Sequence, residues 1–197
     1  GRAVANMPAS VTGSERAGIV LEHAIAAGLV DRGEELIERA REAREEALRA
    51  GDGLLAARGL RNVLTGVRRE GHPLAERRDL ISRIFAELAP LPENPLREQV
   101  RSDALAELAL VELEENHLAE ARALFDESHE IMVRHGWTED ALDLESNLAR
   151  IDVIEGRVAE GMDRMHAIAD EARNLGLELA AVTAYRDACI AGIRALD

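Results

Sequence analysis

The sequence contains no lysine, because all 24 basic residues of the 197-residue chain are arginine. The phosphate-cradling loop of a Walker-type nucleotide site needs a lysine, so that kind of site is excluded. Acidic residues number 38, which gives a formal net charge of −14. Proteins that contact nucleic acid phosphates carry an excess of basic residues along one face, so we expect no direct nucleic acid contact here.

Cysteine and long apolar runs are scarce as well. The single cysteine, Cys189, cannot form an internal disulfide, which fits a reducing compartment and predicts a cytoplasmic protein. The most apolar early stretch, residues 17–30, is short and contains Glu22 and His23, so no membrane span is expected. The chain begins at Gly1 and stops within a helical pattern at Asp197, from which we expect it to be part of a longer protein.

Aromatic residues make up only 2% of the chain, although apolar residues make up 47%. The core must therefore consist of Ala, Leu, Ile and Val, which together with abundant Glu and Arg favour an all-α fold. Turn residues divide the sequence into nine pieces of helical length after an extension at 1–13. The expected helices cover 14–28, 31–50, 53–70, 73–89, 95–115, 117–135, 138–155, 157–175 and 177–195.

Glycine and proline are expected at the ends of these helices. Glycine adopts positive φ without a Cβ clash and therefore suits the position that follows a helix. The glycines that fit this role are Gly28, Gly51, Gly71, Gly136, Gly156 and Gly176. Pro73 and Pro95 are expected at first helical positions, and the longest loop is expected at 90–95.

Residues 108–128 and 148–168 repeat one template. Asn116 marks the inter-helix turn in the first copy and Gly156 marks it in the second, 40 residues later. Residues 63–85 form a weaker copy at a shift of 44 residues, and 22–40 form a divergent first copy. Because an amphipathic helix pair cannot bury its apolar face alone, we expect the copies to stack. The predicted pairs are about 14–50, 53–89, 95–135 and 138–175, followed by an unpaired helix at 177–195.

The two clear copies resemble the tetratricopeptide repeat (TPR). ENHLAEARALF (115–125) has Leu118, Glu120, Ala121 and Phe125 in the motif's places, and EGRVAEGMDRM (155–165) carries the motif again. The second copy departs at Gly161, where the family prefers alanine, and the period of 40 exceeds the usual repeat of about 34 residues. Long, Ala/Arg/Glu-rich copies resemble the helical region of large bacterial LuxR-type transcriptional regulators.

This resemblance implies an all-α, right-handed superhelix of about four TPR-like antiparallel helix pairs plus one terminal helix, within a single domain at 14–197. It also implies a non-catalytic cytoplasmic scaffold that binds a protein, a peptide or a small inducer, without a cofactor. The scaffold would be the sensor or interaction region of a bacterial multidomain regulator in signalling and transcription. Two alternatives stay open: a free-standing TPR adaptor, and the helical arm of a signalling enzyme such as a nucleotide cyclase or kinase.

Catalytic and metal-binding patterns are not expected in this chain. The six histidines have no partners at metal-ligand spacing, so no metal site is predicted. Cys189 has no detectable base beside it and is expected to be a buried apolar thiol. The acidic clusters at 112–116 and 125–130 are interpreted as solvated helix faces.

Partner binding is expected on the concave surface, which the first helices of stacked pairs line. The inward positions of these helices are Asn62, Ala106, Ser146 and Arg186, with Arg69 and Arg150 further along. Arg150 and Arg186 could form a clamp for a carboxylate or phosphate. The alternative is that the two arginines pair with Glu145, Glu178 or Asp187.

The last helix is apolar on more than one side. One stripe consists of Leu179, Val182, Tyr185, Cys189, Ile193 and Leu196, and alanines fill another side. A helix of this kind needs partners on more than one side, so the stripe is predicted to contact a further repeat or a second copy of the chain in a homodimer.

Overall fold

A computed structural model describes residues 11–29 and 32–194, without the side chains of 29, 179, 187–189 and 191–194. Its described part is all-helical and contains no strand, which confirms the predicted fold class. The helices are α2 (Gly13–Leu29), α3 (Gly33–Arg49), α4 (Gly53–Arg69), α5 (Leu74–Leu88), α6 (Pro95–Glu114), α7 (Leu118–His135), α8 (Thr138–Ile154), α9 (Val158–Asn174) and α10 (Glu178–Arg194). Each boundary lies within two residues of the prediction.

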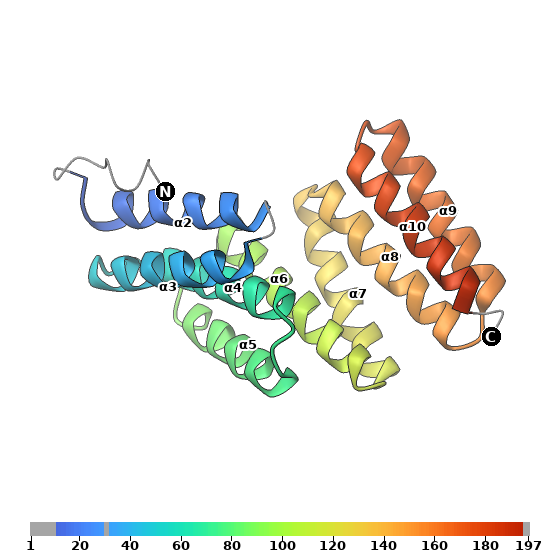
Figure 1. The fold of residues 1–197 in the computed structure, drawn as a ribbon, viewed down its shortest axis with the longest axis horizontal. Coiled ribbons are helices and arrows are strands. Elements are labelled where there is room, and N and C mark those ends of the chain that lie inside the picture. Colours follow the sequence, from blue (N-terminus) through green and yellow to red (C-terminus); the bar gives the residue numbers. More distant parts are fainter. Residues whose placement is uncertain (1–10, 30–31, 195–197) are drawn as a thin grey trace. The chain divides into compact units, whose positions relative to one another are not determined.

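Two compact units divide the chain after Ala104, within α6 (Figure 1). Unit 1 contains α2 to α5 and the beginning of α6, and unit 2 contains the remainder of α6 and α7 to α10. In both units, helices that follow one another in sequence pack side by side. The single domain expected at 14–197 stays a prediction. No helix in the described ranges has the length and apolar character that crossing a membrane requires.

The turns explain why the helices end where they do. Five of the six predicted glycines have positive φ, and Asn116 takes the same left-handed conformation with a φ of 64°. The prediction for Gly28 was wrong, because this residue lies inside α2, buried against Leu36 of α3. Pro95 is the first residue of α6, as predicted, whereas Pro73 precedes α5 as its N-cap.

Unit 1 is held together by close packing of small side chains. Half of the buried apolar residues of α2, α3 and α4 are alanines, such as Ala17, Ala43 and Ala56. On α4, a Cβ added at Gly66 would lie 2.5 Å from Cγ1 of Ile37 in α3. Glycine therefore allows two helix backbones to approach more closely than any other residue would.

Unit 2 has larger side chains in its core. Phe125 and Met132 of α7 pack with residues of α6 and α8, and Met165 of α9 packs with residues of α8 and α10. Trp137 lies in the turn before α8, packs against the first of these clusters and stacks on His135, with ring centroids 4.5 Å apart. Trp137 thus joins the turn to the core.

The repeat register changes by one residue in the turn between α4 and α5. Gly71 and Asn116 both have positive φ and lie 45 residues apart, whereas the second helices begin at Leu74 and Leu118, which are 44 apart. The α4–α5 turn is therefore one residue longer than the α6–α7 turn. First helices α4 and α6 must be compared at a shift of 45, and α6, α8 and α10 at a shift of 40.

Candidate functional site

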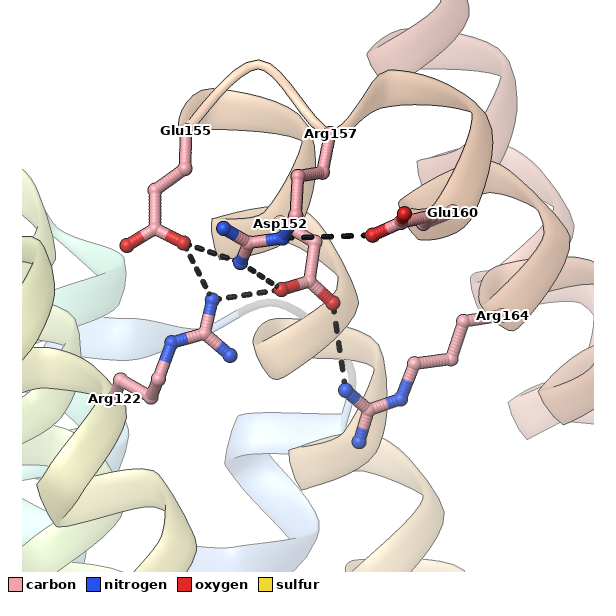
Figure 2. Close-up of polar contacts among 6 residues, drawn as sticks. All are labelled: Arg122, Asp152, Glu155, Arg157, Glu160 and Arg164. Carbon is pink, nitrogen blue, oxygen red and sulfur yellow. Dashed lines mark hydrogen bonds and ion pairs between the residues drawn. The ribbon is translucent and has the colours of Figure 1, made fainter.

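The densest polar cluster in the described part of unit 2 surrounds Asp152, near the end of α8 (Figure 2). The Asp152 side chain is only 12% exposed. One of its carboxylate oxygens accepts from Arg122 of α7 at 2.7 Å and from Arg157 at 2.5 Å, and the other lies 3.4 Å from Nη1 of Arg164 in α9. Glu155 accepts from the same nitrogens of Arg122 and Arg157. Side chains from three helices thus meet at one carboxylate.

The arginines and carboxylates of this cluster form ion pairs with one another. Burial raises the pKa of the Asp152 carboxyl, but hydrogen bonds from Arg157 and Arg122 outweigh burial and bring the pKa below its usual value. Hydrogen bonds from the same two arginines lower the pKa of Glu155. Both carboxylates are therefore ionised at neutral pH and have no proton to exchange. The cluster thus links α7, α8 and α9 through ion pairs.

A similar group lies 40 residues earlier, at the turn between α6 and α7. Nδ1 of His117 lies 2.8 Å from Oε2 of Glu112 and 3.7 Å from Oε2 of Glu115. These residues have the sequence positions of Arg157, Asp152 and Glu155. The hydrogen bond to Glu112 raises the pKa of His117 above its ordinary value. The turn thus places a cation between two carboxylates in both repeats, and only His117 can lose its charge near neutral pH.

Glu112, Glu115 and His117 are the residues that could hold a metal ion in the described part of the chain, with ligand atoms within 4.8 Å of one another. A histidine nitrogen with two carboxylates is a ligand set that divalent transition metals accept. At the equivalent place in the next repeat, the guanidinium of Arg157 lies between the carboxylates of Asp152 and Glu155. A cationic side chain is therefore sufficient to balance two carboxylates at this turn. The expectation that no metal binds stays a prediction.

The predicted inward residues differ in accessibility. Asn62 and Ser146 are 5% and 7% exposed, and each donates a hydrogen bond to the carbonyl one turn earlier in its own helix. Both side chains therefore have little surface to offer a partner. The longer α4–α5 turn also means that Arg61, rather than Asn62, is equivalent to Ala106 and Ser146, and Arg61 forms an ion pair with Asp103 at 2.6 Å.

The three predicted arginines lie in different settings. Arg69 donates to the carbonyl oxygen of Gly28 and so ties α4 to α2. Arg186 is exposed on α10. Arg150 is half-buried on α8 and has no hydrogen bond or ion pair with any residue that the structure describes. Glu145, one of the three acids named in the alternative to the clamp, lies 3.0 Å from Nε2 of His129. The clamp formed by Arg150 and Arg186 stays a prediction.

Only part of the predicted apolar stripe on α10 can be located. Val182 is 64% exposed, whereas Tyr185 packs toward α9, where its hydroxyl donates to Asp170 at 2.7 Å. Tyr185 therefore faces the core side of α10. Leu179, Cys189 and Ile193 lie on α10 with side chains outside the described set, and Leu196 lies outside the described residues.

A cavity of about 280 Å³ in unit 1 was not predicted. It lies between the second helices α3 and α5, with apolar lining from Leu60 and Val63 of the first helix α4. Leu80 of α5, three arginines and three acidic residues complete its lining, so its charge is balanced. Arg44 of α3 bonds to Glu87 of α5 at 2.5 Å and ties the two walls together. The charge balance gives this cavity no preference for an anion or a cation.

The two unit 2 clusters share a sequence pattern that the metal-ligand and catalytic spacings considered above do not include. Two acids three residues apart, followed two residues later by a cation, occur at Glu112, Glu115 and His117 and again 40 residues later. Only the fold brings Arg122 and Arg164 to the second copy, since both come from neighbouring helices.

Comparison with known proteins adds a fold likeness. No protein-family model and no curated protein matches the chain. Among solved structures, nearly identical TPR-like repeats from a Podosopora anserina protein assigned to the kinesin light chains align with a TM-score of 0.61. That alignment covers 90% of this chain and 86% of the other, at 14% identity. A variant of those repeats aligns with a TM-score of 0.58 over 92% and 93% of the two chains, at 15% identity. The chain therefore has a TPR-like helical repeat fold.

Proposed function

We propose that this chain is a non-catalytic scaffold that binds a protein or peptide partner through the first helices of its TPR-like pairs. The observation that carries the proposal is Arg150, a half-buried residue of the first helix α8 whose guanidinium no described residue binds. TPR-like stacks commonly hold partner proteins on the surface that their first helices line. A guanidinium recognises carboxylates bidentately, so the partner would present an acidic side chain or a carboxyl terminus.

The broader setting of this scaffold is also a proposal. Resemblance of the long, Ala/Arg/Glu-rich repeats to the helical region of LuxR-type regulators supports a sensor or interaction region of a bacterial multidomain transcriptional regulator. In that setting a small inducer with a carboxylate is a second kind of ligand for Arg150. A cytoplasmic location accords with the single cysteine.

Peptide selection tests the binding role. A random peptide library displayed on phage is selected against the chain, and Kd values of enriched peptides are measured by fluorescence anisotropy. A hydrogen-bonded charge pair contributes about 1.5–3 kcal/mol, so Arg150→Ala should weaken binding about 10- to 100-fold. Arg134→Ala is the matched control, because Arg134 also has no partner among the described residues but lies on the second helix α7.

Enriched peptides should carry a carboxylate, and their affinity should depend on Arg150 and not on Arg134. The proposal is wrong if no peptide is enriched, or if both variants weaken binding equally.

A further inference from the structure

One position of the first helices has the same environment in three repeats and a different one in the last. The register set by the turns makes Ala57 of α4, Ser102 of α6, Leu142 of α8 and Val182 of α10 equivalent. Ala57 and Ser102 are 0% exposed and Leu142 is 3% exposed, whereas Val182 is 64% exposed. This position is therefore buried on α4, α6 and α8, each of which is followed by another first helix, and exposed on α10.

The neighbours of Leu142 show how the position becomes buried. Leu142 packs in one cluster with Ala169 and Ala172 of α9 and with Ala181 and Ala184 of α10. Helices α9 and α10, which follow α8 in the chain, thus cover it. The face of α10 that carries Val182 is the next in this series of stacking surfaces, and no helix of the described residues covers it.

The uncovered face, which we call the α10 face, consists of Glu178, Val182, Arg186 and Ile190. These residues are spaced by four, so they lie along one side of the helix. All four are exposed, with Val182 and Ile190 64% and 41% exposed. Glu178 and Arg186 lie at equal distances in sequence on either side of Val182 and carry opposite charges.

We propose that the α10 face binds the α10 face of a second copy of this chain, with the two helices antiparallel and a two-fold axis at Val182. A two-fold interface places the same patch of both subunits in contact, so each contact occurs twice. Val182 then lies against Val182 of the second copy, and Glu178 of each copy lies against Arg186 of the other. The proposal goes beyond the partner-binding role and does not depend on it.

The charges of the α10 face are complementary to those of a second α10 face when the two helices are antiparallel. In a parallel pair, Glu178 would lie against Glu178 and Arg186 against Arg186, and both contacts would be repulsive. Arg186 also interacts within its own chain, but a guanidinium has five N–H donors and can bind an additional carboxylate. The α10 face continues the surface by which helix pairs stack within unit 2, so its shape already suits a helix.

The association should be weak. A helix of 17 residues is roughly 25 Å long, and one helix pair buries less than the roughly 1,200 Å² typical of stable interfaces. We therefore expect a monomer–dimer equilibrium with a Kd on the order of 10–100 μM rather than a permanent dimer.

Sedimentation velocity of the full 197-residue chain over a concentration series tests the proposal. The wild-type chain should shift from monomer to dimer as its concentration rises, and Val182→Asp should remove the shift. Val133→Asp is the matched control, because Val133 is 58% exposed on α7 and should leave dimerisation unchanged. Circular dichroism verifies that each variant keeps its helix content.

A charge-swap cycle then tests the arrangement. Glu178→Arg and Arg186→Glu should each weaken dimerisation about tenfold, and the double variant should restore it, because the swap recreates both cross-subunit pairs. A wild-type chain that stays monomeric throughout the series would overturn the proposal and leave the face to another helical protein. Dimerisation that Val133→Asp removes and Val182→Asp does not, or a double variant weaker than either single one, would overturn it as well.

Discussion

Substitution of Gly161 by alanine is the change whose consequence the structure defines most sharply. Gly161 is buried near the beginning of α9, where this helix approaches α8. An added Cβ would lie 2.7 Å from the carbonyl oxygen of Ala149 and 2.6 Å from Cγ2 of Val153. The first of these atoms belongs to helix backbone, so α9 as a whole would have to move away from α8.

Two opposing effects set the magnitude of the change. Alanine is favoured over glycine in a helix by about 1 kcal/mol. Overpacking in a well-filled interior costs about 1–3 kcal/mol, and a contact with backbone cannot be relieved by a change of rotamer. We expect Gly161→Ala to lower the free energy of unfolding by about 1 kcal/mol, whereas propensity alone would raise it by the same amount.

Gly18→Ala is the matched control, because a Cβ at Gly18 in α2 would meet nothing within 4 Å. This variant should gain about 0.5–1 kcal/mol from propensity alone. Urea unfolding is followed by circular dichroism for the whole chain and by the fluorescence of Trp137, the single tryptophan, for unit 2. Two probes are needed because repeat proteins do not always unfold in one step.

The reasoning would be refuted if Gly161→Ala stabilised unit 2 as much as Gly18→Ala stabilises the chain. That result would mean that α8 and α9 separate without cost. The equivalent residue 40 positions earlier is Ala121, which is fully buried, so α6 and α7 accommodate a methyl group at this place.

Three further predictions concern polar groups. Asp152→Asn should lower the free energy of unfolding by about 2 kcal/mol at pH 7 in urea titrations. This difference should shrink as the pH falls below about 4, where the wild-type carboxylate, whose pKa is lowered, also gains a proton. An NMR titration should give His117 a pKa above 6.5, because Glu112, Glu115 and Glu120 all favour its charged form. The stabilisation from His117 should be complete below about pH 6 and lost as the pH rises through that pKa, and His117→Arg should abolish this loss. Asp52→Ala should cost about 1 kcal/mol in thermal unfolding, because the Asp52 carboxylate caps α4 by accepting from the Leu55 amide at 3.0 Å. A neutral result for any of the three would contradict the role given to that side chain.

The helices were predictable because their ends are marked by local chemistry. A left-handed residue such as Gly136 or Asn116 ends the helix before it, since the carbonyls of the last turn need partners that this conformation supplies. Gly28 was the exception, and it shows the limit of local reasoning. Its value to the fold is the close approach of Leu36 and of the Arg69 guanidinium, which come from other helices.

The candidate binding residues were harder to predict, because their positions depend on register. The sequence analysis used a shift of 44 residues, whereas one additional residue in the α4–α5 turn makes the shift between the first helices 45 and moves the inward position from Asn62 to Arg61. Contacts between helices then distinguish residues of the same type. Arg69 and Arg150 are both arginines on first helices, but only Arg69 is bound to a carbonyl oxygen.

By itself, the sequence determined the helical class, the helix boundaries and the repeat, because these follow from propensity, turn residues and apolar period over short stretches. Tertiary structure decided which arginines are engaged and which face of α10 is uncovered. Those features depend on contacts between residues up to about 40 positions apart, such as Arg122 with Asp152 and Gly28 with Arg69. A side chain on a helix surface has the same local pattern whether a neighbouring helix covers it or not, so only the packing of the helices settles its role.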